Sequence, residues 1–280
     1  MNEGLEDINA YSFDSSGVTS LEFPSTVKRV GNYIASKCPD LTSVTFNGVA
    51  EYELGTYSFQ NDTALKTVVL PQGITKIPTY TFVGCTALES VNIPTSVTLI
   101  DTHSFEFCES LKSVTFPQGL VTIQTNAFNG CGLESIEIPA SVQNIFAYGF
   151  ANNVNLKTVV LNEGIVTLGV VNTSPTTSSN GYVFQNCEKL ESINLPSTLE
   201  QFGSYTFANC TSLKTLFIPD NVSYVGGFAF QGWTSDQRIL IESSRFDITN
   251  SWYESATYST DAGYWSDTEA QFVWEYEANN

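Results

Sequence analysis

The chain has 280 residues, of which 42% are hydrophobic, and a formal net charge of −18 at pH 7. The acidic residues are scattered, which argues against a nucleic-acid partner and against an anionic membrane surface, since both require clustered Lys and Arg. No run of about 18 apolar residues occurs, so the sequence predicts no transmembrane helix and no direct membrane insertion. If the protein has an inorganic partner, its charge favours calcium.

The chain opens in the middle of a repeating pattern. Residues 1–7 lack the basic and apolar parts of a signal peptide. Residues 8–13 already have the character of the second half of a unit that recurs further along. We therefore expect that the natural chain begins before Met1 and carries any signal sequence there.

From residue 18 onward the sequence repeats every 23 residues or so. The first position of the unit falls at Val18, Leu41, Leu65, Leu88, Leu111, Leu133, Leu156, Leu190, Leu213 and, in a degenerate copy, Asp236. This period lies in the range of leucine-rich repeats, in which each unit supplies one short strand and a return segment. The sequence thus predicts a solenoid of about ten units that grows by stacking, not around one globular centre.

Each unit carries the same apolar pattern. In one central copy Leu111, Val114 and Phe116 hold positions 1, 4 and 6, and Pro117 follows. Positions 4 and 6 have the period of two that places side chains on one face of a strand, and Pro ends that strand because it cannot donate to a ladder. A second apolar pair and then an aromatic anchor follow. The anchors are Phe13, Phe59, Phe82, Phe105, Phe128, Phe150, Phe184, Phe207 and Phe230, and we expect them to stack as a buried column.

The cysteines share one position of the unit, three residues after the anchor. They are Cys38, Cys85, Cys108, Cys131, Cys187 and Cys210, and other units place Asp62, Asn153 or Trp233 there. A free Cys at an inward position behaves as a small hydrophobe. No C-x₂-C pair is present, so the spacing does not suggest zinc. The sequence predicts six buried thiols, no disulfide, no metal site and no cofactor.

This unit resembles that of the BspA-type leucine-rich repeat family, which reads approximately Leu-x-x-Val-x-Ile-Pro-x-x-Val-x-x-Ile-Gly-x-x-Ala-Phe-x-x-Cys. The resemblance covers about residues 8 to 241. It implies a right-handed leucine-rich-repeat superhelix with a parallel β-sheet on its concave face. It also implies a bacterial or protist surface protein, secreted or held at the cell surface, that adheres to host proteins or other cells without catalysing a reaction.

Two segments break the period. An insertion of 11 residues falls within Gly169–Gly181, and its Ser/Thr-rich composition predicts an exposed loop. Beyond residue 241 the repeat is lost and aromatic residues gather, Trp252 and Trp265 among them. We expect a solenoid over residues 1–241 and an aromatic-rich C-terminal cap over residues 242–280, because the open end of an array must be covered. The alternative is that these aromatic residues stack on sugars.

The outward positions of the predicted strands offer candidate binding residues. Position 2 alternates in sign over seven units, which predicts a surface charge ladder at Lys66, Glu89, Lys112, Glu134, Lys157, Glu191 and Lys214. Position 5 varies, and its apolar members Val69, Val160 and Phe217 are candidate anchors for a protein partner.

A column of aromatic residues precedes the anchors by two positions. Its members are Tyr11, Tyr33, Tyr57, Tyr80, His103, Asn126, Tyr148, Tyr182, Tyr205 and Phe228. Sequence alone leaves two interpretations open: an exposed Tyr stripe used for binding, or half-buried packing. The column is interrupted at His103 and Asn126, so we take these two with Tyr80 and Tyr148 as candidate contacts.

No catalytic constellation accompanies these features. His103 is the only histidine and lies in no nucleophile motif. The sequence therefore predicts a monomeric, non-enzymatic protein that binds a protein or glycan. Two alternatives remain: a structural spacer within a longer chain, and a glycan-binding module built on the C-terminal aromatics. An enzyme would require a pocket formed by the insertion.

Overall fold

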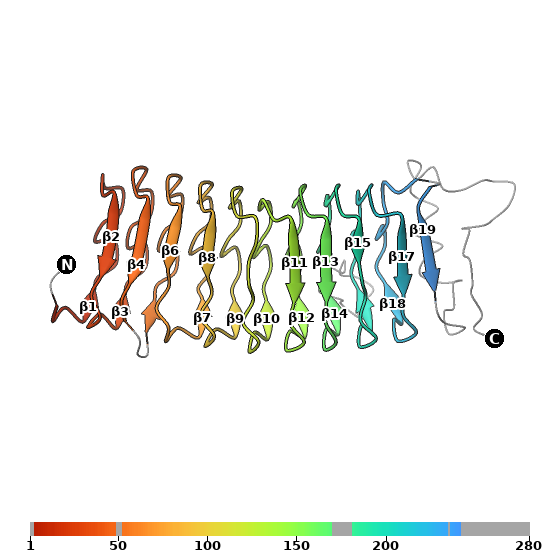
Figure 1. The fold of residues 1–280 in the computed structure, drawn as a ribbon, viewed down its shortest axis with the longest axis horizontal. Coiled ribbons are helices and arrows are strands. Elements are labelled where there is room, and N and C mark those ends of the chain that lie inside the picture. The colour runs from red at the N-terminus through yellow and green to blue at the C-terminus, as the bar shows by residue number, and fades with distance from the viewer. Residues whose placement is uncertain (1–2, 49–51, 170–180, 235, 242–280) are drawn as a thin grey trace, which may run out of the picture.

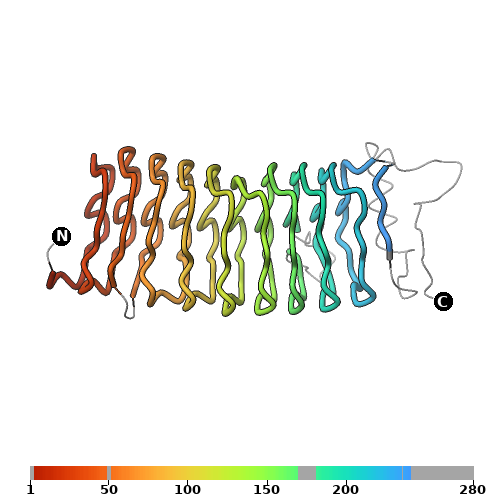
Figure 2. Tube along the Cα trace, in the orientation of Figure 1, coloured from red at the N-terminus to blue at the C-terminus, as the bar shows by residue number. Residues whose placement is uncertain are grey.

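The protein is a solenoid of about ten stacked turns, each about 23 residues long, in a computed structural model (Figure 1). The structure describes residues 3–48, 52–169, 181–234 and 236–241. The described residues contain no helix long and apolar enough to span a membrane. The coils lie side by side along the long axis of the molecule, and Figure 2 shows how the chain completes one loop before it starts the next. The predicted repeat solenoid is confirmed.

The first strand of each coil lies in a column of parallel strands, here called the first column. Its strands are β2 (Ser20–Phe23), β4 (Ser43–Phe46), β6 (Thr67–Val69), β8 (Ser90–Asn92), β11 (Ser135–Ile138), β13 (Thr158–Leu161), β15 (Ser192–Ile193), β17 (Thr215–Ile218) and β19 (Arg238–Ile241). They pair as β2-β4-β6-β8, β11-β13-β15 and β17-β19. One coil, at residues 111–117, contributes only a bridge between Asn92 and Thr115. Buried and outward residues alternate along these strands, as the period of two predicts.

The return segment adds a second strand of two residues per coil, and these form the second column. Its strands are β1 (Asp7–Ile8), β3 (Arg29–Val30), β5 (Glu53–Leu54), β7 (Lys76–Ile77), β9 (Leu99–Ile100), β10 (Thr122–Ile123), β12 (Asn144–Ile145), β14 (Thr167–Leu168), β16 (Gln201–Phe202) and β18 (Tyr224–Val225). The column is divided once, between β5 and β7.

The predicted phenylalanine column fills the centre. Seven consecutive anchors, from Phe59 to Phe207, have no exposed surface. Their rings stack with centroids 5.1 to 5.9 Å apart. The stack continues from Phe150 to Phe184 across the insertion, with centroids 5.9 Å apart. Burying each ring stabilises the fold by roughly 1.5–3 kcal/mol, so the column makes a large contribution to the core.

The cysteines occupy the inward position that the sequence predicts, and all six are free and buried. Each thiol donates a hydrogen bond to the carbonyl of the anchor residue one coil earlier, as Cys85 does to Phe59 at 3.0 Å. Asn153 makes the same contact with Phe128 through Nδ2. Trp233 does so with Phe207 through Nε1. The position therefore favours a small or flat side chain that can donate a hydrogen bond inward.

The turn around each anchor depends on left-handed backbone. The residues two before the anchor have φ near +57°, from Tyr11 to Phe228. The residues two after it are also left-handed, and they are Ser15, Lys37, Asn61, Gly84, Phe107, Gly130, Asn152, Asn186, Asn209 and Gly232. Asn and Gly tolerate this region best. The aromatic column is thus a column of turn residues and not part of an extended strand.

Candidate binding surface

The outward face of the first column carries the apolar residues that the sequence singles out. Val69, Val160 and Phe217 are 48%, 37% and 48% exposed. The face does not bring all three together. At about 4.8 Å per strand, Val69 lies six coils, or about 29 Å, from Phe217, whereas Val160 lies two coils, or about 10 Å, away.

Phe217 has an apolar neighbour that the sequence analysis missed. It stands in register with Leu240 of the adjacent strand β19, and Leu240 is half-buried and faces the same way. Leu240 escaped notice because its unit begins at Asp236 and lacks the Leu that marks the other copies. We call Val160, Phe217 and Leu240 the terminal patch. Exposed aromatic and aliphatic side chains grouped in this way are typical of the centres of protein interfaces.

The charged residues at position 2 form fewer ion pairs among the described residues than their alternating signs predict. Lys112 and Glu134 lie 3.7 Å apart, and both are well exposed. Lys214 pairs with Asp236 at the C-terminal end of the row. Exposed pairs of this kind contribute roughly 0–1 kcal/mol, so the row mainly keeps this face hydrated and gives it alternating charge.

The aromatic column forms two face-to-face stacks. The first runs from Tyr11 to His103, with ring centroids 4.5 to 5.0 Å apart. The second runs from Tyr148 to Phe228, with centroids 4.4 to 5.1 Å apart. Burial raises the pKa of the Tyr80 hydroxyl. Because the rings cover each other's faces, the stacks present ring edges and hydroxyl groups to a partner. This geometry supports the packing interpretation for most of the column.

Asn126 separates the two stacks. His103 stacks on Tyr80 with one face, at 4.5 Å, and its other face is directed toward the Asn126 coil. On the far side of that coil Tyr148 begins the second stack. Among the described residues no ring stacks on the faces of His103 and Tyr148 that turn toward Asn126, so a flat group from a partner can stack there. His103, Asn126 and Tyr148 therefore remain candidates, and each is half-buried.

A buried carboxylate holds His103 in place. Glu106 is 8% exposed, and its Oε2 lies 2.6 Å from His103 Nδ1. Its Oε1 accepts a hydrogen bond from Asn129 Nδ2 at 2.8 Å. Glu106 was not identified from the sequence, although it lies three residues after the single histidine. The arrangement fixes the ring orientation.

Asn129 begins a ladder of amides that runs along the solenoid. Each amide donates from Nδ2 to the Oδ1 of the Asn one coil earlier: Asn152 to Asn129, Asn186 to Asn152, and Asn209 to Asn186, at 2.7 to 2.8 Å. All donors point the same way, and the chain of bonds ends on Glu106. Such a row of aligned, partly buried hydrogen bonds rigidifies the turn that carries the second aromatic stack.

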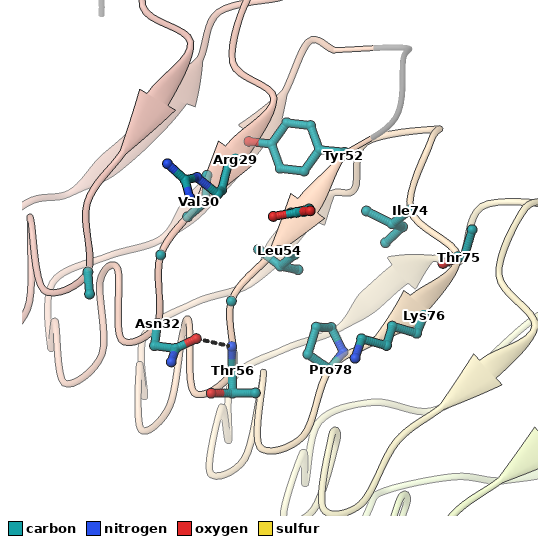
Figure 3. Close-up of a pocket in the computed structure, with 14 residues that line it drawn as sticks. Arg29, Val30, Asn32, Tyr52, Leu54, Thr56, Ile74, Thr75, Lys76 and Pro78 are labelled. Carbon is teal, nitrogen blue, oxygen red and sulfur yellow. Dashed lines mark hydrogen bonds between the residues drawn. The ribbon is translucent and has the colours of Figure 1, made fainter.

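One cavity of about 630 Å³ opens at the division between β5 and β7. Figure 3 shows Arg29 and Val30 on one side, Ile74 and Lys76 on the other, and Leu54 between them. None of the sequence-predicted candidates lines this cavity. The predicted insertion loop and the aromatic-rich cap lie outside the described residues, apart from Gly169 and Gly181 at the loop ends.

Comparison with known proteins identifies the repeat. The model of the BspA type leucine rich repeat region matches six copies, over residues 1–106, 75–173 and 176–267. The chain belongs to this family. No curated protein matches the chain.

Three solved structures share the fold. A leucine-rich repeat protein from Bacteroides ovatus is 25% identical with a TM-score of 0.54, and the match covers 80% of this chain and 57% of that one. A leucine rich cell surface protein from Faecalibacterium prausnitzii is 22% identical with a TM-score of 0.50, covering 86% and 78%. The leucine-rich repeat protein of T. pallidum is 22% identical with a TM-score of 0.51, covering 80% and 91%. The chain thus spans little more than half of the Bacteroides ovatus protein.

Proposed function

We propose that this BspA-type chain is a non-catalytic, monomeric binding module, secreted or attached to a cell surface, that recognises a protein or glycan of a host or neighbouring cell. The terminal patch is the observation that carries the proposal. Phe217 is 48% exposed in a regular strand, where its ring adds no burial to the core. A large aromatic side chain held on a rigid sheet meets the usual requirements of an interface anchor.

The surroundings of the patch support a macromolecular partner. The face is broad and regular, with polar residues at position 3 such as Thr215, and the relative from Faecalibacterium prausnitzii is a cell surface protein. Val69 lies on the same face, and the ring faces at His103, Asn126 and Tyr148, beside Tyr80, supply a second region of contact. A surface of this extent suits a protein or an extended glycan better than a small substrate.

Binding assays on two panels test the proposal. The chain is presented by biolayer interferometry to extracellular-matrix proteins and, separately, to a glycan array. We expect saturable binding in one panel and a loss of about tenfold or more in affinity for Phe217→Ala. Phe107→Ala is the matched control, because Phe107 is 46% exposed but lies at a turn outside the first column. Binding in neither panel, or equal binding by Phe217→Ala, would overturn the proposal.

A further inference from the structure

The second column lacks one set of ladder bonds, and the sequence explains why. At most paired positions the residue after a strand donates its N–H to the carbonyl of the last residue of the preceding strand, as Asp101 does to Ile77 at 3.0 Å. Gln124 does the same to Ile100 at 2.9 Å. After β7 that residue is Pro78, which has no N–H. The Leu54 carbonyl therefore lacks the ladder donor that this position supplies elsewhere.

A second departure in the neighbouring coil holds the strands apart. The connection from β4 to β5 is one residue longer than that from β2 to β3. It places Tyr52 inside, packed edge-on against Phe46 with centroids 5.4 Å apart. The neighbouring coils use Val27 and Ile74 in this part of the core. The larger ring and the missing donor together leave no β5–β7 pairing among the described residues.

The coils remain joined on both sides of this opening. β4 and β6 pair in register, with Ser43 opposite Thr67. Past the opening, Tyr57 donates its N–H to the Thr79 carbonyl at 3.1 Å. The separation is therefore a local slit between two otherwise bonded coils and not a break in the solenoid.

A polar group buried in the wall of the slit is unsatisfied. Tyr52 is 8% exposed and lines the cavity, and its hydroxyl has no hydrogen-bond partner among the described residues. Burial raises the pKa of this hydroxyl, so it is a neutral donor. A buried hydroxyl left unpaired carries a desolvation cost that no hydrogen bond offsets. A ligand that accepts this hydrogen bond would remove that cost.

We propose that the slit binds an extended peptide segment of a partner protein, which adds one strand between β5 and β7. Main-chain pairing with exposed strand edges is an established mode of peptide recognition. A residue in a sheet occupies roughly 160 Å³, from a rise of about 3.3 Å, a strand spacing of about 4.8 Å and a layer of about 10 Å. The cavity of about 630 Å³, which also reaches Arg29 and Asn32 beyond β5, thus holds at most about four residues. This inference does not depend on the terminal patch.

The residues that line the slit also determine which peptide fits as the inserted strand. Its inward side chain meets Leu54, Ile74 and Pro78, which favours an apolar residue. Its outward side chains lie between Glu53 and Lys76, both exposed and of opposite charge. An alternating segment with polar residues outside and a branched apolar residue inside meets both demands. The chain's own strand β10, at Thr122–Ile123, has this pattern.

The probe is therefore a labelled, acetylated and amidated peptide with the sequence of residues 119–124, Gly-Leu-Val-Thr-Ile-Gln. We expect saturable binding in fluorescence polarisation and at least a tenfold loss when alternate peptide nitrogens are methylated, because methylation removes the ladder donors. Pro78→Ala restores the missing donor, closes the slit and lowers peptide affinity at least tenfold. Tyr52→Phe should weaken peptide binding. The control variant Tyr11→Phe removes a hydroxyl from an exposed ring and should leave peptide binding unchanged.

Each outcome bears on the proposal. Equal binding of the methylated and unmethylated peptides, or no saturable binding up to millimolar peptide, overturns it. The methylation test uses only the unaltered protein, so it stands even where Pro78→Ala fails to fold, which circular dichroism reports. Phe217→Ala leaves peptide binding unchanged, so failure here and failure of the proposed function are distinguishable.

Discussion

Asp62 occupies the position where other coils place a hydrogen-bond donor. Replacing it by Asn tests whether this buried position favours a donor. Cys38 and Cys85 in the adjacent coils, and Asn153 further along, all donate inward to an anchor carbonyl. Asp62 is fully buried. Its Oδ1 accepts the Cys38 N–H at 2.7 Å, and its Oδ2 has no partner among the described residues. An ionised carboxylate cannot donate, so the position favours the protonated acid.

The pKa of Asp62 follows from this burial. Burial raises the pKa from 3.8 to about 8, the Cys38 N–H lowers it, and the charge of Asp14 raises it. A carboxyl group with a raised folded-state pKa stabilises the fold fully below the unfolded pKa, and that stabilisation is lost as the pH rises toward the folded pKa. Between about pH 4 and pH 7 the contribution of Asp62 to the free energy of unfolding should fall with rising pH, by up to about 4 kcal/mol in total.

Asp62→Asn keeps the shape and supplies a permanent donor. We expect it to match the unaltered protein near pH 4 and to be more stable by up to about 4 kcal/mol at pH 7. The measurement is urea unfolding, followed by circular dichroism at one-unit steps from about pH 4 to pH 8. The exposed Asp40→Asn is the control for the loss of one negative charge. Identical pH profiles for Asp62→Asn and the unaltered protein would refute the reasoning.

Two further predictions concern the core. Phe128→Ala removes a ring stacked 5.1 Å from Phe105 and 5.3 Å from Phe150, and it should lower the free energy of unfolding by about 3–5 kcal/mol. The same urea assay measures this. A loss of stability no larger than that of the exposed Phe107→Ala would contradict the prediction. Titration with an aromatic disulfide reagent should detect almost no thiol in the native protein and all six after denaturation, because the cysteines are free and buried. Burial also raises the pKa of these thiols, that of Cys187 to about 12. Rapid reaction of the native protein would exclude the stacked arrangement.

Much of the solenoid was predictable because each repeat places the same residue types at the same positions. The Phe anchors, the inward cysteines and the alternation along the first column all follow from residue type and spacing, and each is confirmed. Val69, Val160 and Phe217 could be placed outward by parity alone. Their separation along the face could also be estimated from the strand spacing, since the register of a solenoid advances one strand per coil.

What the sequence did not predict depends on departures from the repeat. The direction of the aromatic column is set by left-handed backbone at residues such as Tyr80, which periodicity does not encode. The slit depends on a single added residue, on Tyr52 and on Pro78, each of which resembles ordinary variation in one copy. Glu106 joins His103 to Asn129 across two coils, and only the stacked structure brings these three together.

The outward face of the first column is the proposed binding surface. Hydroxyl-radical footprinting of the chain, free and saturated with a partner from the binding panels, tests it most directly, because oxidation reports side-chain exposure. Val160, Phe217 and Leu240 should become protected, whereas Val154, which is 45% exposed at a turn, should not change. Unchanged oxidation of the terminal patch in the saturated complex would contradict the account.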